Sequence, residues 1–170
     1  MAVEAAAGSA WSTFTARAEL LGAAVMRTSS QDTAASLLLE AAPNYVCTRS
    51  AASRFPRLAE RAQQAGSQPA VEVVAGAEFA VAETGSVAID EPADDRGRCF
   101  LAERLWLLVP QDALVQSLDE ALQRMGELIR RGAHHPLLMS GPSRTADIER
   151  VLTIGVHGPR ALVIVIVSGL

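Results

Sequence analysis

Helical and strand-like patterns alternate along the first half of the chain, and this order limits the possible folds more than any other feature. Helical spacing of apolar residues and their stop signals predict helices over 11–21, 29–42 and 56–65. Short apolar runs predict strands over 23–28, 45–48 and 71–74. Such alternation is typical of an α/β fold whose mostly parallel sheet is covered by helices.

The length suits one domain of this kind, since a chain of 170 residues can bury a sizeable core. Hydrophobic residues make up 49% of the chain and aromatic residues only 4%, so alanine, valine and leucine must build that core. We expect residues 1–10, which are rich in alanine, to form a loose tail and residues 11–170 to form a single α/β domain.

The middle of the chain interrupts the alternation. Strand-like runs at 79–82, 87–89 and 105–109 follow one another without a clear helix, which predicts a mixed or hairpin portion of the sheet. The acidic residues between them (Asp90, Glu91, Asp94 and Asp95) suit either a divalent cation or a solvated surface, and the sequence favours the solvated surface.

The last third of the chain carries its clearest helix and its candidate site. A capping pattern at 117–120, an apolar stripe and a final Gly132 predict a helix over 117–131. A strand at 136–140, a polar loop and a helix from about residue 146 come next, and a buried strand at 162–167 closes the chain.

The polar loop combines the parts of an anion site. Gly141 leaves the backbone open, and Ser143, Arg144 and Thr145 place two hydroxyls and a guanidinium beside the expected start of a helix. An alternative stays open, in which the hydroxyls only cap the helix and Arg144 pairs with Asp147 or a neighbouring acid.

Further candidates follow from the rule that ligands collect beyond the carboxyl ends of parallel strands. Glu83 faces the polar loop if its strand runs parallel to strand 136–140. His157 should lie about 14 Å away in a simple strand-helix-strand crossover, so it either supports a turn or indicates a different local topology. His134 and His135 are adjacent and make a poor metal pair, and we predict no metal site.

Charge and cysteine content exclude several partners. The net charge is −4, and the 15 basic residues are all arginine and form no run, so neither nucleic acid nor an anionic membrane is an expected partner. No apolar run approaches the ~20 residues of a membrane span, and no signal-peptide pattern is visible, so we expect a cytoplasmic protein. Two cysteines, Cys47 and Cys99, are too few and too far apart for a cluster motif.

Three segments together resemble a known family. Residues 82–86 (Ala-Glu-Thr-Gly-Ser), 140–149 (Ser-Gly-Pro-Ser-Arg-Thr-Ala-Asp-Ile-Glu) and 155–159 (Gly-Val-His-Gly-Pro) look like the signature segments of the lactate-utilisation protein C family, which carries a LUD domain. One departure is visible, because the family commonly has a proline and then a histidine before strand 105–109, where this chain has Ala102 to Trp106.

The resemblance implies a bacterial cytoplasmic protein that works with two iron–sulfur partner subunits in oxidising L-lactate to pyruvate. It also implies a three-layer αβα sandwich related to the ribose-5-phosphate-isomerase (NagB/RpiA-like) and CoA-transferase superfamily. The expected role is an accessory subunit without its own cofactor, in which Gly141, Ser143, Arg144 and Thr145 hold a carboxylate or phosphate, with Asp147 and His157 as supporting residues.

Two other functions stay open. The Glu83-Thr84-Gly85 sequence resembles the setting of the nucleophilic glutamate in CoA-transferases, so an acyl-transfer enzyme that uses Glu83 is one alternative. A regulator that binds a small molecule without any partner is the other.

Overall fold

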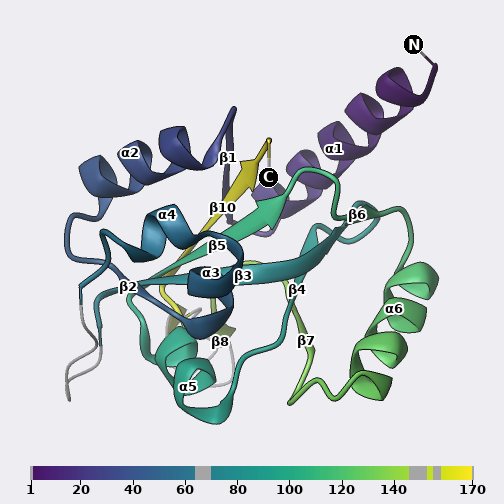
Figure 1. Cartoon of the computed structure of the whole chain (residues 1–170). Coiled ribbons are helices and arrows are strands. Elements are labelled where there is room, and N and C mark those ends of the chain that lie inside the picture. Colours follow the sequence, from purple (N-terminus) through teal and green to yellow (C-terminus); the bar gives the residue numbers. More distant parts are fainter. Residues whose placement is uncertain (1, 64–69, 146–152, 155–157, 170) are drawn as a thin grey trace.

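The computed structural model describes residues 2–63, 70–145, 153–154 and 158–169, and Figure 1 shows their arrangement. The helices are α1 (Ala2–Leu20), α2 (Gln31–Ala41), α3 (Arg49–Arg54), α4 (Pro56–Ala59), α5 (Ala93–Leu101) and α6 (Leu118–Arg130). The strands are β1 (Ala24–Thr28), β2 (Val46–Cys47), β3 (Glu72–Val81), β4 (Ser86–Ile89), β5 (Arg104–Pro110), β6 (Leu114–Val115), β7 (Leu137–Met139), β8 (Arg144–Thr145), β9 (Thr153–Ile154) and β10 (Ala161–Val167).

The main sheet is mixed and mostly parallel, as the alternating pattern predicts. Its strands follow the order β1-β10-β5-β3-β4-β7, and β2 and β6 also pair with β3. The strands β1, β10, β5, β3, β2 and β6 pair in parallel, whereas β3–β4 and β4–β7 are antiparallel. The expected hairpin portion is therefore confirmed in β3, β4 and β7.

Central strands β5 and β10 are buried on both faces, so helices must cover both sides of the sheet. Leu105, Leu107 and Val109 point into one core with α1, whereas Trp106 and Leu108 point into the other with α2, α3 and α4. Figure 1 shows α2, α3 and α4 on the near face and α1 behind the sheet.

Strand β3 runs without interruption through two segments that the sequence predicts as separate strands. Its first half pairs with β5 and β2, and its second half pairs with β4 and β6. The register with β4 shifts between Ala77 and Phe79. Such an irregularity bends a strand and increases its twist, so one strand serves two parts of the sheet.

Several helices differ from their predicted bounds. The first helix begins at Ala2 instead of Trp11, because alanine has the highest helix propensity. The helix predicted over 56–65 is only the short α4, and α3 precedes it. The acidic stretch forms α5 instead of a loop, since Asp94 and Asp95 in its first turn suit the positive end of a helix.

The end of the polar loop is a short strand, which the sequence analysis does not predict. Arg144 and Thr145 form strand β8, which pairs antiparallel with β9 at Thr153 and Ile154. Residues 146–152, where we expected the helix, lie outside the described residues. Within the described ranges, none of the helices is both long and apolar enough to cross a membrane.

Replacing Phe14 tests how firmly α1 is held to the sheet. Its side chain is fully buried, and its ring lies 5.4 Å edge-on from the ring of Trp11. We expect Phe14→Ala to lower the free energy of unfolding by about 3–5 kcal/mol. Ser12→Ala, an exposed position on the same helix, should change it by less than about 0.5 kcal/mol.

Urea unfolding followed by circular dichroism measures both variants. Equal unfolding midpoints for the two would show that α1 does not belong to the core.

Candidate functional site

The first two signature segments meet at one end of the β3–β4–β7 portion of the sheet. The turn 83–86 joins β3 to β4, and Ser140 follows β7 directly. Because β4 and β7 pair with Val87 opposite Met139, Ser86 and Ser140 lie side by side, with their hydroxyl oxygens 2.6 Å apart. Thr84 donates a hydrogen bond to Ser86 at 2.8 Å and so fixes the same turn.

The end of α1 covers this junction through two glycines. Gly85 and Gly141 both have positive φ, of 68° and 72°. A Cβ at Gly85 would lie 2.5 Å from the Ala18 nitrogen, and one at Gly141 would lie 2.5 Å from the Leu21 oxygen. No other residue fits at either position without moving α1. The two signature segments are thus shaped to receive the end of this helix.

The third signature segment reaches the same place. The Ser143 N–H donates a hydrogen bond to the Pro159 carbonyl at 2.9 Å, and Gly158 leaves just enough room for the Ser143 side chain. A simple crossover would separate these loops by about 14 Å, so the contact between Ser143 and Pro159 is closer than a simple crossover predicts. The His157 side chain lies outside the described residues, and its role stays a prediction.

Arg144 extends from this junction toward the turn between α1 and β1. Its guanidinium lies against Gly22, where any Cβ would overlap it, and Pro142 packs beside it. The residue is exposed and belongs to β8. Ser143 and Arg144 are therefore held together with Gly141, and Arg144 belongs to a strand. Asp147 lies outside the described residues, and of Thr145 only the backbone is described.

Glu83 lies near this junction, but its carboxylate is engaged elsewhere. Its Oε2 accepts a hydrogen bond from the Leu118 N–H at 2.7 Å, in the first turn of α6. Ser117 caps the same helix by accepting from the Glu120 N–H. Glu83 thus adds a negative charge where the helix dipole favours one.

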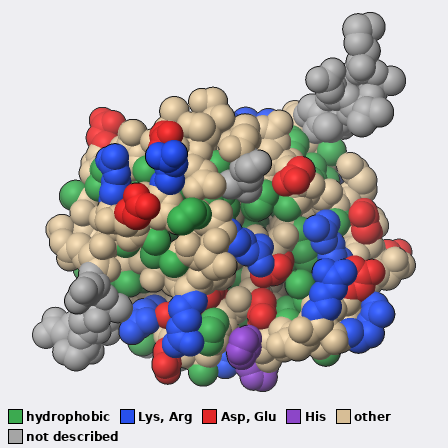
Figure 2. All heavy atoms as spheres, viewed as in Figure 1, with side chains coloured by type: hydrophobic (Ala, Val, Ile, Leu, Met, Phe, Trp, Pro, Cys, Tyr) green, Lys and Arg blue, Asp and Glu red, His purple; other side chains and the backbone are tan. Residues whose placement is uncertain are grey.

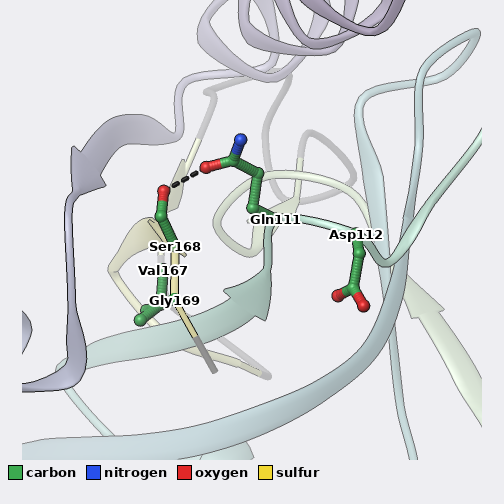
Figure 3. A pocket seen from close by; sticks show the side chains of 5 residues that line it. All are labelled: Gln111, Asp112, Val167, Ser168 and Gly169. Carbon is green, nitrogen blue, oxygen red and sulfur yellow. Dashed lines mark hydrogen bonds between the residues drawn. The ribbon is translucent and has the colours of Figure 1, made fainter. Parts of the chain in front are cut away.

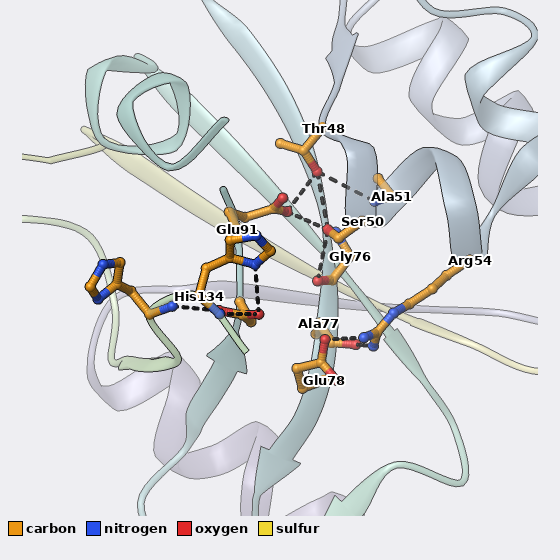
Figure 4. Close-up of polar contacts among 11 residues, drawn as sticks. Thr48, Ser50, Ala51, Arg54, Gly76, Ala77, Glu78, Glu91 and His134 are labelled. Carbon is orange, nitrogen blue, oxygen red and sulfur yellow. Dashed lines mark hydrogen bonds and ion pairs between the residues drawn. The ribbon is translucent and has the colours of Figure 1, made fainter. Parts of the chain in front are cut away.

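A buried polar network, which the sequence did not reveal, lies on the other side of the bend in β3 (Figure 4). Glu91 is only 1% exposed, and its Oε1 accepts hydrogen bonds from Thr48, at 2.6 Å, and from Ser50. Ser50 also bonds the N–H and the carbonyl of Gly76. Burial raises the pKa of Glu91, and the nearby Asp95 raises it further, whereas the hydroxyl donors act in the opposite direction.

Asp95 is the second buried acid of this region. It accepts a hydrogen bond from the Arg49 N–H at 3.0 Å and pairs with Arg98 at 2.7 Å. The expectation of a solvated acidic surface is therefore wrong for Glu91 and Asp95, although Asp94 is exposed. The sequence feature that could have indicated this network is Thr48-Arg49-Ser50 at the start of α3. A hydroxyl at a helix start accepts a hydrogen bond from a backbone N–H, and its own O–H still needs an acceptor.

The two cysteines are free and lie on opposite faces of the sheet, Cys99 in the core on the α1 side and Cys47 against the core on the other side. Burial raises the pKa of Cys47 to about 12 and raises that of Cys99 further above its usual range, so both thiols are held neutral. In the described parts of the chain, no group of three His, Cys, Asp or Glu side chains is arranged to hold a metal ion.

A cavity of about 340 Å³ lies at the carboxyl ends of β5 and β10 (Figure 3). Gln111, Asp112, Val167, Ser168 and Gly169 line it, and Ser168 donates a hydrogen bond to Gln111. This is the edge at which parallel sheets usually bind ligands. Among the predicted site residues that the structure describes, none lines it, because the three signature segments meet at the end of α1 instead.

Glu91 makes a test of the buried network possible. Because its pKa is raised in the folded protein, the native state keeps a proton that the unfolded chain loses. Stability must then fall as the pH rises from about 4.3, the ordinary carboxyl pKa, to the raised value. We expect Glu91→Gln to remove this fall and to gain stability relative to the parent between pH 4 and 8.

Thermal unfolding across that range measures the effect. Asp94→Asn, on an exposed carboxylate of α5, should leave the slope unchanged. Glu91→Ala should cost about 1–3 kcal/mol, since it leaves buried hydroxyls without their acceptor. Parallel pH curves for the parent and Glu91→Gln would contradict a raised pKa of Glu91 in the folded protein.

The three segments lie within the part of the chain that is similar to a known family. The family model of the LUD domain matches residues 69–167, which is more than half of the chain. Lactate utilization protein C of Deinococcus radiodurans is 36% identical over 99 residues, covering 56% of this chain and 46% of the relative. Lactate utilization protein C of Geobacillus thermodenitrificans is 33% identical over 100 residues, covering 56% and 41%.

Other similarities point the same way. The uncharacterized protein YkgG of Escherichia coli is 32% identical over 97 residues, covering 54% of this chain and 42% of its own length. The matched region thus spans somewhat less than half the length of these relatives. A crystal structure of a DUF162 family protein from Deinococcus radiodurans superposes with a TM-score of 0.67, covering 96% of this chain and 98% of that one at 21% identity, which supports the fold.

The family model matches residues 69–167, and the three signature segments lie within that range and meet at one place. This chain therefore belongs to the LUD domain family.

Proposed function

We propose that this chain is an accessory subunit of an iron–sulfur-linked L-lactate oxidation system. The proposal rests on the family membership and on relatives that are named lactate utilization protein C. The neutral, separated thiols of Cys47 and Cys99 are unsuited to cluster ligation. The proposal therefore assigns the iron–sulfur clusters to two partner subunits. It places the whole complex in the cytoplasm.

The observation that carries the proposal is the meeting of the three signature segments at the end of α1. Ser86 contacts Ser140, Ser143 contacts Pro159, and the exposed Arg144 guanidinium lies on the same surface. An arginine held in this way binds a carboxylate or a phosphate through paired hydrogen bonds. The surface would hold such a group on a small ligand or on a partner subunit.

The acyl-transfer alternative receives less support. A nucleophilic glutamate needs a carboxylate that is free to attack, whereas the Glu83 carboxylate accepts a hydrogen bond from the start of α6. We also infer a relation to the CoA-transferase and ribose-5-phosphate-isomerase superfamily, because the mixed, mostly parallel sheet with helices on both faces suits that fold.

Arg144→Ala tests the proposed surface. We expect the variant to fold normally, since the side chain is exposed, and to lower lactate-dependent dye reduction by the assembled complex about 10-fold or more. The complex is recovered from lactate-grown cells through a tag on this chain and assayed for iron and for cysteine-rich partners. Arg57→Ala is the matched control, because Arg57 is an exposed arginine of α4 whose ion pair with Asp32 is solvated.

Two results would contradict the proposal. Unchanged lactate oxidation by the assembled Arg144→Ala complex would exclude the anion role of this surface. Recovery of an iron-free single chain under gentle conditions would exclude the accessory role itself.

A further inference from the structure

A second cavity lies on the lower side of the molecule, between α5, the end of α6 and the segment that leads into β7. It has a volume of about 600 Å³, which is within the range of small-molecule sites. Phe100, Ile129 and Leu137 form apolar walls, and Arg96, His134 and His135 contribute polar groups. Figure 2 shows the histidine side chains on the surface in this region, with arginine and acidic side chains around them.

Arg96 is the unexplained group in this cavity. Its Nη1 atom is buried, and no hydrogen-bond acceptor for it is found among the described residues. A buried N–H donor without an acceptor is costly, because it gives up its hydration and receives nothing in exchange. The Arg96 side chain as a whole is half-buried and lines the cavity. Arg98, on the same helix, shows the usual arrangement, since Asp95 accepts its hydrogen bond at 2.7 Å.

Asp90 holds the histidine wall of this cavity in place. Asp90 accepts hydrogen bonds from the backbone N–H groups of His134 and His135, at 3.1 and 2.8 Å, and its carboxylate lies 3.7 Å from the His134 ring. These bonds hold the histidine segment against the end of β4 and so fix one wall of the cavity. Each of the two carboxylate oxygens of Asp90 accepts one of these backbone hydrogen bonds.

We propose that this cavity binds a small organic carboxylate with a ring-sized apolar body. The carboxylate would pair with the part of the Arg96 guanidinium that lines the cavity, because an arginine supplies charge-assisted donors to such a group. The apolar body would lie against Phe100 and Leu137, where it is removed from water. Inorganic phosphate has no apolar part, so it would use only the arginine.

This inference is independent of the proposed function, since neither Arg144 nor the end of α1 lines the cavity. Binding can be measured on the isolated chain, without partner subunits. Failure of one proposal therefore does not imply failure of the other.

The test uses 4-fluorobenzoate, with fluorine NMR of the full chain as the readout. We expect saturable binding with a Kd of about 1 mM or tighter. Arg96→Gln should weaken this binding about 10-fold or more. Arg131→Gln is the matched control, because Arg131 is an exposed arginine at the end of α6 that does not line the cavity.

A second variant keeps the test valid if Arg96→Gln fails to fold. Ala133→Leu fills part of the cavity and leaves Arg96 in place, so it should abolish binding while thermal unfolding stays near that of the parent. 4-Fluorobenzyl alcohol, which has the ring but no charge, should bind about 10-fold more weakly than the acid.

Three outcomes would overturn the proposal. One is the absence of saturable 4-fluorobenzoate binding by the parent chain. Another is equal binding of 4-fluorobenzoate by Arg96→Gln and Arg131→Gln. That result would show that binding depends on the net charge of the protein and not on Arg96. The third is displacement of 4-fluorobenzoate by inorganic phosphate at equal concentration, which would show an anion site without apolar recognition.

Discussion

The bend in β3 is the constraint on which the rest of the structure depends. It lies between Ala77 and Phe79, where the register with β4 shifts, and α3 holds it from one side. Ser50 bonds both backbone groups of Gly76, and Arg54 bonds the Ala77 carbonyl and the Glu78 carboxylate. A Cβ at Gly76 would lie 3.0 Å from the Ser50 backbone, so the helix approaches the strand as closely as a glycine allows.

This bend explains why the signature segments meet where they do. Beyond it, β3 leaves its pairing with β5 and pairs with β4, which pairs in turn with β7. The turn 83–86 and the residues after β7 are thereby brought beneath the end of α1. The Ser143–Pro159 hydrogen bond then links the segment after β7 to the start of β10. Glu91, at the end of β4, is buried by the same arrangement.

The parts of this fold that sequence predicts best are those governed by local periodicity and by capping. Strand 162–167 and helix 117–131 were predicted almost to their ends, because an apolar run and a complete cap specify each one locally. The buried state of Glu91 is not predictable from local sequence, since it depends on the hydroxyls of Thr48 and Ser50, which lie 43 and 41 residues earlier in the chain. The strand at Arg144 was missed for a similar reason, because its partner at Ile154 is separated from it by residues with a helical pattern.

The region that matches the family model is not a complete folding unit in this chain. Residues 69–167 include β3 to β10, but the core on the α1 side also contains Trp11, Phe14, Ala18 and Ala23. Strand β1 pairs with β10 along its whole length and covers an edge that would otherwise expose unpaired backbone groups. The glycines of the signature segments are shaped to receive α1, which lies outside the matched region. The matched region therefore includes the surface that contacts α1, whereas the stability of that surface also depends on α1 and β1, which lie outside the matched region.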